Sequence, residues 1–424
     1  MPSPVSDTRG PLSWQQRSRL QRDHERHERI VNPKAVVALP SDLSFAQLRE
    51  RLAAIVSREE SLRVTEFSYA RDSVTYSADV ELPLRQSEVD SAEELDELVS
   101  AAVERPFPRS GGPLWSVSVV THPDRNGAPV RSLCVVFDHL VTDGRSRQLF
   151  LDELIDRRAG SPRERGKYRN WVDWQLHRYP RDAAGAPAAA RDFWRAYLDG
   201  TAPDRPAGLP FCAEPHGELS GVVNEIHLEL PITIADLGTA AKGLKSSPFV
   251  IFLAAVSCTI GTVSAVRDVT LRVNTPARLG GYLDTLGYFA ETVPVRVRSP
   301  RLDEPDAAVR ATMTAWLQVL EHQTTPWDYV LAVASPTGRA STLSRPAQVL
   351  VNFIPWPMLG GQSAPPPFRR FRAEVGTFQL IMTVSDRGRC HLHCQFDPHR
   401  FTEHGVRDFL VLLEQLIVKL GSAR

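Results

Sequence analysis

The chain has 424 residues, and its 50 Lys and Arg residues balance 50 Asp and Glu, so the formal net charge is zero. Such a balance lacks the basic surplus that nucleic-acid-binding proteins carry, and we expect no nucleic-acid partner. A composition of 42% hydrophobic and 24% charged residues excludes a disordered or fibrous chain. Because one hydrophobic core stops growing at about 250–300 residues, the length predicts two lobes of about 200 residues each.

The cysteines and the N-terminus indicate the cellular compartment. The five cysteines are scattered and odd in number, which favours reduced thiols. The segment MPSPVSDTRG has no apolar signal region, so we expect a cytoplasmic protein. Residues 246–266 carry no charge and are long enough to cross a bilayer. Their proline, serine, threonine and glycine residues favour a buried helix instead, and we expect no membrane association.

The periodicity of apolar residues predicts helices in both halves of the chain. Residues 44–56 have one apolar stripe at helical spacing. Ser91 followed by Glu94 is typical of a capping box at the start of a second amphipathic helix. A third helix is predicted over residues 406–420. Short β-rich runs lie between the helices, at 115–120, 133–137, 269–273, 292–297 and 348–353.

Two stretches near the middle of the chain predict a linker. Residues 183–190 are rich in alanine, and residues 201–210 are rich in proline and glycine. We therefore expect an N-terminal lobe at 1–180, a linker at 181–210 and a C-terminal lobe at 211–424. A further segment, residues 355–367, has five prolines and two glycines in thirteen residues and predicts an exposed loop.

The most informative segment is residues 131–160. A predicted strand runs into the polar loop DHLVTDG, residues 138–144, and an amphipathic helix follows. Polar groups held between two rigid elements are typical of active sites. Thr142 or Asp143 could cap the helix, and Gly144 would let the backbone pass close to a ligand or a neighbouring strand. From residue types alone, a solvated turn in which His139 has no role is the simpler interpretation.

The loop resembles the HHxxxDG signature of the condensation domains of nonribosomal peptide synthetases, which belong to the chloramphenicol acetyltransferase-like acyltransferase superfamily. The resemblance continues in the family's order over residues 11–420. The segments that carry it include PLSWQQ at 11–16, PF and GPL at 106–114, YRNWVDWQ at 168–175, TPAR at 275–278, LGYF at 286–289, and HQ and PW at 322–327.

This resemblance implies an α/β (α+β) fold of two chloramphenicol acetyltransferase-like lobes, arranged as a V-shaped pseudo-dimer with a tunnel at their interface. The implied reaction moves an acyl or aminoacyl group from a phosphopantetheine thioester to a small-molecule amine, or less often an alcohol, in specialised-metabolite (antibiotic) biosynthesis. The thioester would sit on a separate acyl or peptidyl carrier protein, or on coenzyme A (CoA). No bound cofactor or metal is implied. Because the matching segments occupy nearly the whole chain, we expect a free-standing, monomeric condensation enzyme.

The resemblance also assigns residue roles. His139 occupies the position of the motif's second histidine and would be the catalytic base that orients the acceptor. A histidine with the ordinary pKa near 6.5 suits that task. Asp143 would pair with Arg278 and hold the loop, and Gly144 would leave room for the backbone. Asn352, on the predicted strand 348–353, is expected to contact substrate.

Three departures from the family pattern leave other functions open. Asp138 replaces the first histidine and is also expected to contact substrate. Its carboxylate could orient a basic acceptor, bond to nearby backbone N–H groups, or reflect changed acceptor chemistry. Glu59 stands where the family often has a histidine, and Gln379 where an aspartate is usual. The alternatives are an ester-forming or CoA-dependent enzyme of the same fold, and a catalytically silent relative that recruits another enzyme to a carrier-bound intermediate.

Two further motifs are similar to known functional sites, but the residues in and around them argue against those functions. The run CHLHC, residues 390–394, is similar to a zinc site, but in a strand its cysteines and histidines would face opposite sides. The run LGGQS, residues 359–363, is similar to the carrier-protein segment whose serine takes phosphopantetheine. The Ala-Pro-Pro-Pro that follows forbids the helix which that site needs.

Overall fold

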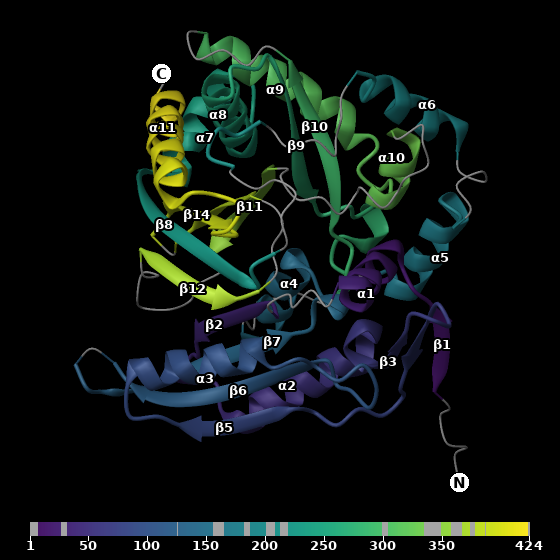
Figure 1. Cartoon of the computed structure of the whole chain (residues 1–424). Coiled ribbons are helices and arrows are strands. Elements are labelled where there is room, and N and C mark those ends of the chain that lie inside the picture. Colours follow the sequence, from purple (N-terminus) through teal and green to yellow (C-terminus); the bar gives the residue numbers. More distant parts are fainter. Residues whose placement is uncertain are drawn as a thin grey trace.

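The chain folds into two stacked α/β lobes (Figure 1). The computed structural model describes residues 7–26, 32–124, 126–155, 165–181, 187–200, 208–212, 219–298, 304–334, 349–357, 367–373, 378–385 and 387–422. Each lobe has its own hydrophobic core, one centred on the N-terminal sheets and the other on the C-terminal sheet. The expected two-lobed α/β architecture is confirmed.

The N-terminal lobe is built on two small sheets. A four-stranded sheet has the order β2-β7-β6-β5, and a three-stranded sheet has the order β1-β4-β3. The strands are β1 (Thr8–Pro11), β2 (Lys34–Ala38), β3 (Val64–Ser68), β4 (Ser73–Tyr76), β5 (Leu84–Glu88), β6 (Trp115–Pro123) and β7 (Pro129–Phe137). The helices are α1 (Trp14–Arg26), α2 (Phe45–Arg58), η1 (Glu60–Arg63), α3 (Ala92–Glu104), η2 (His139–Val141), α4 (Gly144–Ile155) and α5 (Tyr168–Arg178).

The C-terminal lobe is built on one seven-stranded sheet of order β10-β9-β11-β13-β14-β8-β12. The strands are β8 (Val222–Thr233), β9 (Asp268–Thr275), β10 (Glu291–Arg298), β11 (Val349–Pro357), β12 (Phe368–Arg372), β13 (Phe378–Val384) and β14 (Arg389–Phe396). The helices are α6 (Ala188–Tyr197), α7 (Ile234–Gly243), α8 (Pro248–Val263), η4 (Gly280–Tyr282), α9 (Pro305–Leu320), α10 (Trp327–Ala334) and α11 (Glu403–Gly421).

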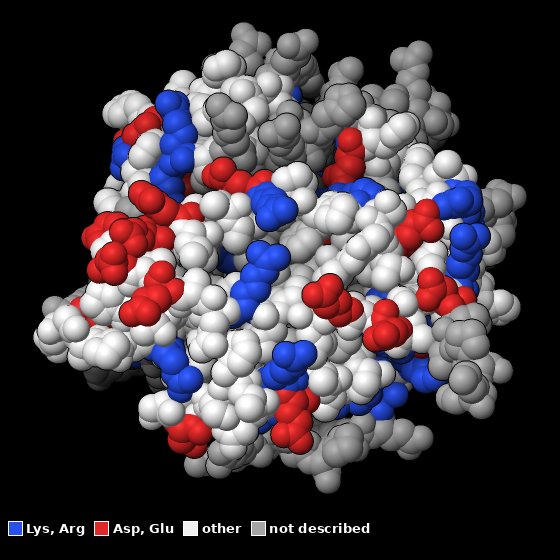
Figure 2. All heavy atoms as spheres, turned by 90° about the horizontal axis from the view of Figure 1, so that it is seen from below, with Lys and Arg blue, Asp and Glu red and all other residues white. Residues whose placement is uncertain are grey.

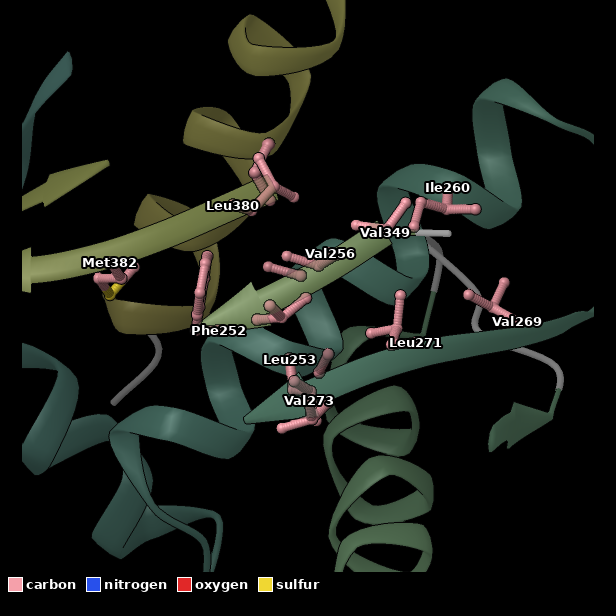
Figure 3. Close-up of a cluster of buried hydrophobic side chains, with 14 of the residues drawn as sticks. Phe252, Leu253, Val256, Ile260, Val269, Leu271, Val273, Val349, Leu380 and Met382 are labelled. Atoms are coloured by element: carbon pink, nitrogen blue, oxygen red, sulfur yellow. The ribbon is translucent and has the colours of Figure 1, made fainter. Parts of the chain in front are cut away.

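Helix α8 forms the centre of the C-terminal core. Every residue from Val250 to Ile260 is buried, as expected for a helix that is apolar all round. Figure 3 shows Phe252, Leu253 and Val256 of α8 against side chains of β9, β11 and β13. Among the described residues, no single helix is long and apolar enough to cross a membrane, and α7 with α8 meets that test only as a pair bent by 86°.

Three local expectations need correction. The predicted loop at 355–367 begins later, because β11 continues to Pro357; a register shift between Ile354 and Pro357 accommodates the prolines in the strand. The predicted linker 181–210 contains α6, whose Trp194 is buried in the C-terminal core. In the predicted capping box Ser91 does cap α3, but the Glu94 carboxylate accepts from the N–H of Asp90 instead of that of Ser91.

The CHLHC run lies on strand β14, as predicted, and alternates between faces. Cys390 and Cys394 belong to the C-terminal core, whereas His391 and His393 lie on the other face with His227. All five cysteines are free thiols. Within the described residues, no group of three or more His, Cys, Asp or Glu side chains is arranged to hold a metal ion. The LGGQS run lies outside the described residues.

Candidate active site at the junction of the two lobes

The motif loop begins where strand β7 ends. β7 lies between β2 and β6, and its residues from Ser132 to Phe137 are buried. Asp138 then caps the short helix η2, because its Oδ1 accepts a hydrogen bond from the N–H of Leu140 at 2.9 Å. The Gln16 amide of α1 donates to the Leu140 carbonyl oxygen at 3.0 Å. The backbone around His139 is therefore held from both sides.

Both carboxylate oxygens of Asp143 are used within the protein. Oδ1 accepts from the backbone N–H of Ser146 at 2.8 Å and from Nη2 of Arg278 at 2.7 Å. Oδ2 accepts from the backbone N–H groups of Phe289 and Ala290 at 3.0 and 3.1 Å. Asp143 thus caps α4 and also ties the motif loop to the C-terminal lobe.

Arg278 completes this tie between the lobes. Only 2% of its side chain is exposed. Nη1 donates to the Thr285 carbonyl at 2.9 Å, and Nη2 also donates to the Ser146 hydroxyl at 2.8 Å. The guanidinium carbon lies 4.0 Å from the centre of the Phe289 ring, a cation–π contact. The Ser146 hydroxyl in turn donates to the Gly287 carbonyl at 2.7 Å. Ser146 had no motif signal of its own in the sequence.

Gly287 packs directly against the ring of Tyr168. A Cβ at Gly287 would lie 2.2 Å from Cδ2 of Tyr168, whereas a Cβ at Gly280 would meet nothing within 4 Å. Tyr168 cannot move aside easily, because it is buried and its hydroxyl donates to the Tyr288 carbonyl at 2.9 Å.

We therefore expect Gly287→Ala to lower the free energy of unfolding by about 1–3 kcal/mol, as overpacking of a buried site does. The matched control Gly280→Ala should change it little. Urea unfolding of both variants measures the difference. Equal stability of the two variants would contradict this packing.

His139 lies at the boundary between the lobes. Its side chain is half-buried, and its ring faces Tyr288 of the C-terminal lobe with centres 4.6 Å apart. Nδ1 is buried and has no hydrogen-bond partner among the described residues. Burial, and next the charge of Arg19, lower the pKa of His139 to about 4. The imidazole is therefore neutral at pH 7, and the ordinary pKa assumed from the sequence does not hold here.

Asp138 is engaged within the N-terminal lobe. Besides its bond to Leu140, its Oδ2 accepts from Nη1 of Arg109. The other end of that guanidinium, Nη2, lies 2.6 Å from Oδ2 of Asp23 on α1. Only 3% of Asp138 is exposed. Of the three uses considered for this carboxylate, bonding to a nearby backbone N–H is the one that the structure displays.

The other positions singled out in the sequence are Gly144, Asn352, Gln379 and Glu59. Near Gly144, an added Cβ would meet only Nη2 of Arg147, at 4.0 Å, so no neighbouring strand of the described chain explains the glycine. Asn352 is half-buried on β11, and Gln379 is half-buried on β13. Glu59 is buried and joins the lobes, because its Oε2 accepts from the N–H of Leu286 at 3.3 Å.

Comparison with known proteins agrees with this geometry. A family model described as "Condensation domain" matches residues 8–420. Chondramide synthase cmdD of Chondromyces crocatus is 25% identical over 84% of this chain and 9% of its own length. Tyrocidine synthase 2 of Brevibacillus parabrevis is 24% identical over 74% of this chain and 9% of its own length. The chain thus spans about a tenth of the length of these curated relatives.

Solved structures share the whole fold. The condensation domain of the monacolin K polyketide synthase MokA superposes with a TM-score of 0.77 at 15% identity, covering 98% of this chain and 97% of that one. A mutant of the starter condensation domain of rhizomide synthetase RzmA, in complex with C8-CoA and Leu-SNAC, gives a TM-score of 0.76 at 14% identity, with 98% and 95% covered. With the family match over residues 8–420 and this two-lobed fold, the chain belongs to the condensation domain family.

Proposed function

We propose that this chain is an acyltransferase that moves an acyl or aminoacyl group from a phosphopantetheine thioester to an amine, forming an amide in specialised-metabolite biosynthesis. The observation that carries the proposal is the position of His139. Its neutral imidazole lies at the lobe junction, on a loop that Asp143 and Arg278 lock in place. Rigid support of a single polar group is what acyl transfer by positioning requires.

Acyl transfer to an amine needs few protein groups besides the His139 imidazole. The acceptor nitrogen attacks the thioester carbonyl carbon, the C–N bond forms, the C–S bond breaks, and the proton lost by nitrogen ends on the departing thiol. Because Nδ1 of His139 is shielded, Nε2 is the nitrogen left to accept a hydrogen bond from the acceptor N–H. An imidazole with a pKa of about 4 is a weak base, so we assign His139 to orienting the acceptor and easing the proton's departure.

Gly144 is the residue that indicates space for the donor arm. Its Cβ position faces space that no neighbouring strand of the described chain fills. We propose that the phosphopantetheine arm or the acceptor passes there, along a tunnel between the lobes. The carboxylate of Asp138 would support the loop, since it is held by Arg109.

The pH dependence tests the state of His139. The active form is the neutral imidazole, which persists down to pH values near 4 because burial lowers the pKa to about 4. We therefore expect kcat/KM to stay level from pH 8 to about pH 5.5, where an ordinary histidine would already be mostly protonated. An acceptor amine of low pKa keeps its own ionisation outside this range. A fall of kcat/KM centred near pH 6.5 would contradict the assignment.

The function itself is tested by reconstitution. Purified protein is incubated with acyl groups on carrier proteins, the same acyl groups on CoA, and a panel of amines and alcohols, and products are identified by mass spectrometry. We expect amide products from carrier-bound donors. Ester products would identify an ester-forming enzyme of the same fold. A preference for CoA would identify a CoA-dependent one. Absence of transfer from every donor would favour the silent recruitment module.

A further inference from the structure

Helix α1, whose Gln16 contacts the motif loop, carries two arginines to the lobe junction. Arg19 and Arg22 are three residues apart and so share one face of the helix. Arg19 is 6% exposed, and Arg22 is half-buried. The Nε atoms of both are buried and have no hydrogen-bond partner among the described residues. Both positive charges counteract the rise in the pKa of half-buried Tyr288, the residue whose ring faces His139.

The carboxylates near these arginines are already engaged. Asp23 contacts Arg109 at 2.6 Å and lies 3.5 Å from Nε of Arg19. Asp138 is held by the same Arg109, and Asp143 is held by Arg278.

Among the described acids, Glu291 also faces Arg22. Its Oε2 accepts from the Gln15 amide at 2.9 Å and its Oε1 from the N–H of Thr292 at the same distance. Burial raises the pKa of Glu291 to about 8, so it carries little charge at pH 7. Three arginines, Arg19, Arg22 and Arg109, thus have two described carboxylates, those of Asp23 and Asp138, between them. An anionic ligand near His139 would offset the remaining positive charge.

We propose that Arg19 and Arg22 bind the free carboxylate of the acceptor, so that the acceptor is an amino acid with an unmodified carboxyl group. This inference rests on the proposed function. In an α-amino acid one carbon separates the amine from the carboxylate, so an amine hydrogen-bonded to His139 brings its carboxylate to the neighbouring guanidinium groups. Guanidinium and carboxylate form short, charge-assisted hydrogen bonds.

The other substrate does not supply this anion. The thioester end of a phosphopantetheine arm is uncharged, and its phosphate lies at the opposite end of the arm, far from the reacting carbonyl. An aminoacyl acceptor bound to a carrier protein is also uncharged at its carbonyl. A free carboxylate on the acceptor therefore matches the charge beside His139 better than a tethered acceptor does.

Matched acceptor pairs test the inference with the wild-type protein. Each amino acid is offered as the free acid and as its carboxamide, with one loaded donor. We expect the free acid to be preferred by at least about tenfold in kcat/KM, as loss of a charge-assisted hydrogen bond predicts. Equal use of acid and amide would overturn this inference but leave the proposed function standing. No transfer to either would count against the proposed function itself.

Variants on α1 test whether Arg19 and Arg22 cause the preference for the free acid. Arg19→Gln and Arg22→Gln should reduce the preference for the free acid over the carboxamide, mainly by raising KM for the free acid. The matched control is Arg17→Gln, because Arg17 lies on the same helix but pairs with the partly exposed Asp72 at 3.0 Å. Melting temperatures show whether each variant is folded. A preference that survives in both folded variants would overturn the assignment to these arginines.

A donor-free readout separates binding from catalysis. The charge of Arg19 lowers the pKa of His139, so a carboxylate bound to Arg19 should shift that pKa upward. The pKa is followed by NMR of labelled histidine, with the His139→Gln variant identifying the signal. We expect an upward shift with the free amino acids and none with their carboxamides. Identical shifts with both, or none with either, would contradict carboxylate binding here.

Discussion

Replacing His139 by alanine should lower kcat/KM for amide formation by about 10²–10⁴-fold, the range expected when one positioned proton-transfer group is lost. The fold should survive the change. Nδ1 of His139 has no hydrogen-bond partner among the described residues, so the replacement leaves no buried group unpaired. The measurement is a steady-state condensation assay with a loaded carrier protein, together with a thermal unfolding curve.

A surface histidine supplies the matched control for this experiment. His404 on α11 is 91% exposed and far from the motif loop in sequence, so His404→Ala should retain wild-type activity. A wild-type rate in a folded His139→Ala variant would refute the role assigned to this imidazole. A similar loss of rate in both variants would show that the assay does not report on the site.

Removal of the Asp143 charge should have the largest effect on stability. In Asp143→Ala, Arg278 remains as a buried cation, and the N–H groups of Phe289 and Ala290 lose their acceptor. We expect the free energy of unfolding to fall by about 3–5 kcal/mol, with loss of activity as a consequence. Chemical denaturation of the two proteins measures this difference.

A variant in an exposed ion pair shows how much burial adds to the stability cost of losing one partner. Arg407 and Glu403 form a pair at 2.7 Å on the surface of α11, and Glu403→Gln should cost at most about 0.5 kcal/mol. Combining Asp143→Ala with Arg278→Met should restore part of the stability, because the second change removes the unpaired charge. An Asp143→Ala variant that keeps the wild-type melting temperature but loses activity would contradict the structural role.

Regular elements could be predicted from the sequence because their signals are local. The apolar stripe of residues 44–56 and the uncharged run 246–266 correspond to α2 and α8. The strand before the motif loop is β7. In each case the spacing or the run of apolar residues directly reflects which face is buried.

Features that depend on distant contacts could not be predicted in this way. The lowered pKa of His139 results from burial at the lobe junction and from Arg19, which is 120 residues earlier in the numbering. Ser146 and Glu59 join the two lobes through contacts with segment 286–287, and nothing local in the sequence indicates either contact. The proline-rich end of β11 is paired because a register shift absorbs the missing N–H groups.

The surface agrees with the neutral composition. On the face shown in Figure 2, Lys and Arg side chains are interspersed with Asp and Glu, and acidic side chains gather at the left of the view. A carrier protein that docks on this face would therefore meet local charges of both signs, and ionic strength should affect its association only moderately.

The most direct test is a single-turnover experiment on an acyl-loaded carrier protein, followed by intact-protein mass spectrometry. With the wild-type protein and an amino acid acceptor, the acyl mass should disappear from the carrier and reappear as an amide of the acceptor, while the mass of the wild-type protein itself stays unchanged. The His139→Ala variant should leave the carrier loaded over the same time. A carrier that stays loaded with both proteins, or unloads equally fast with both, would contradict acyl transfer at His139.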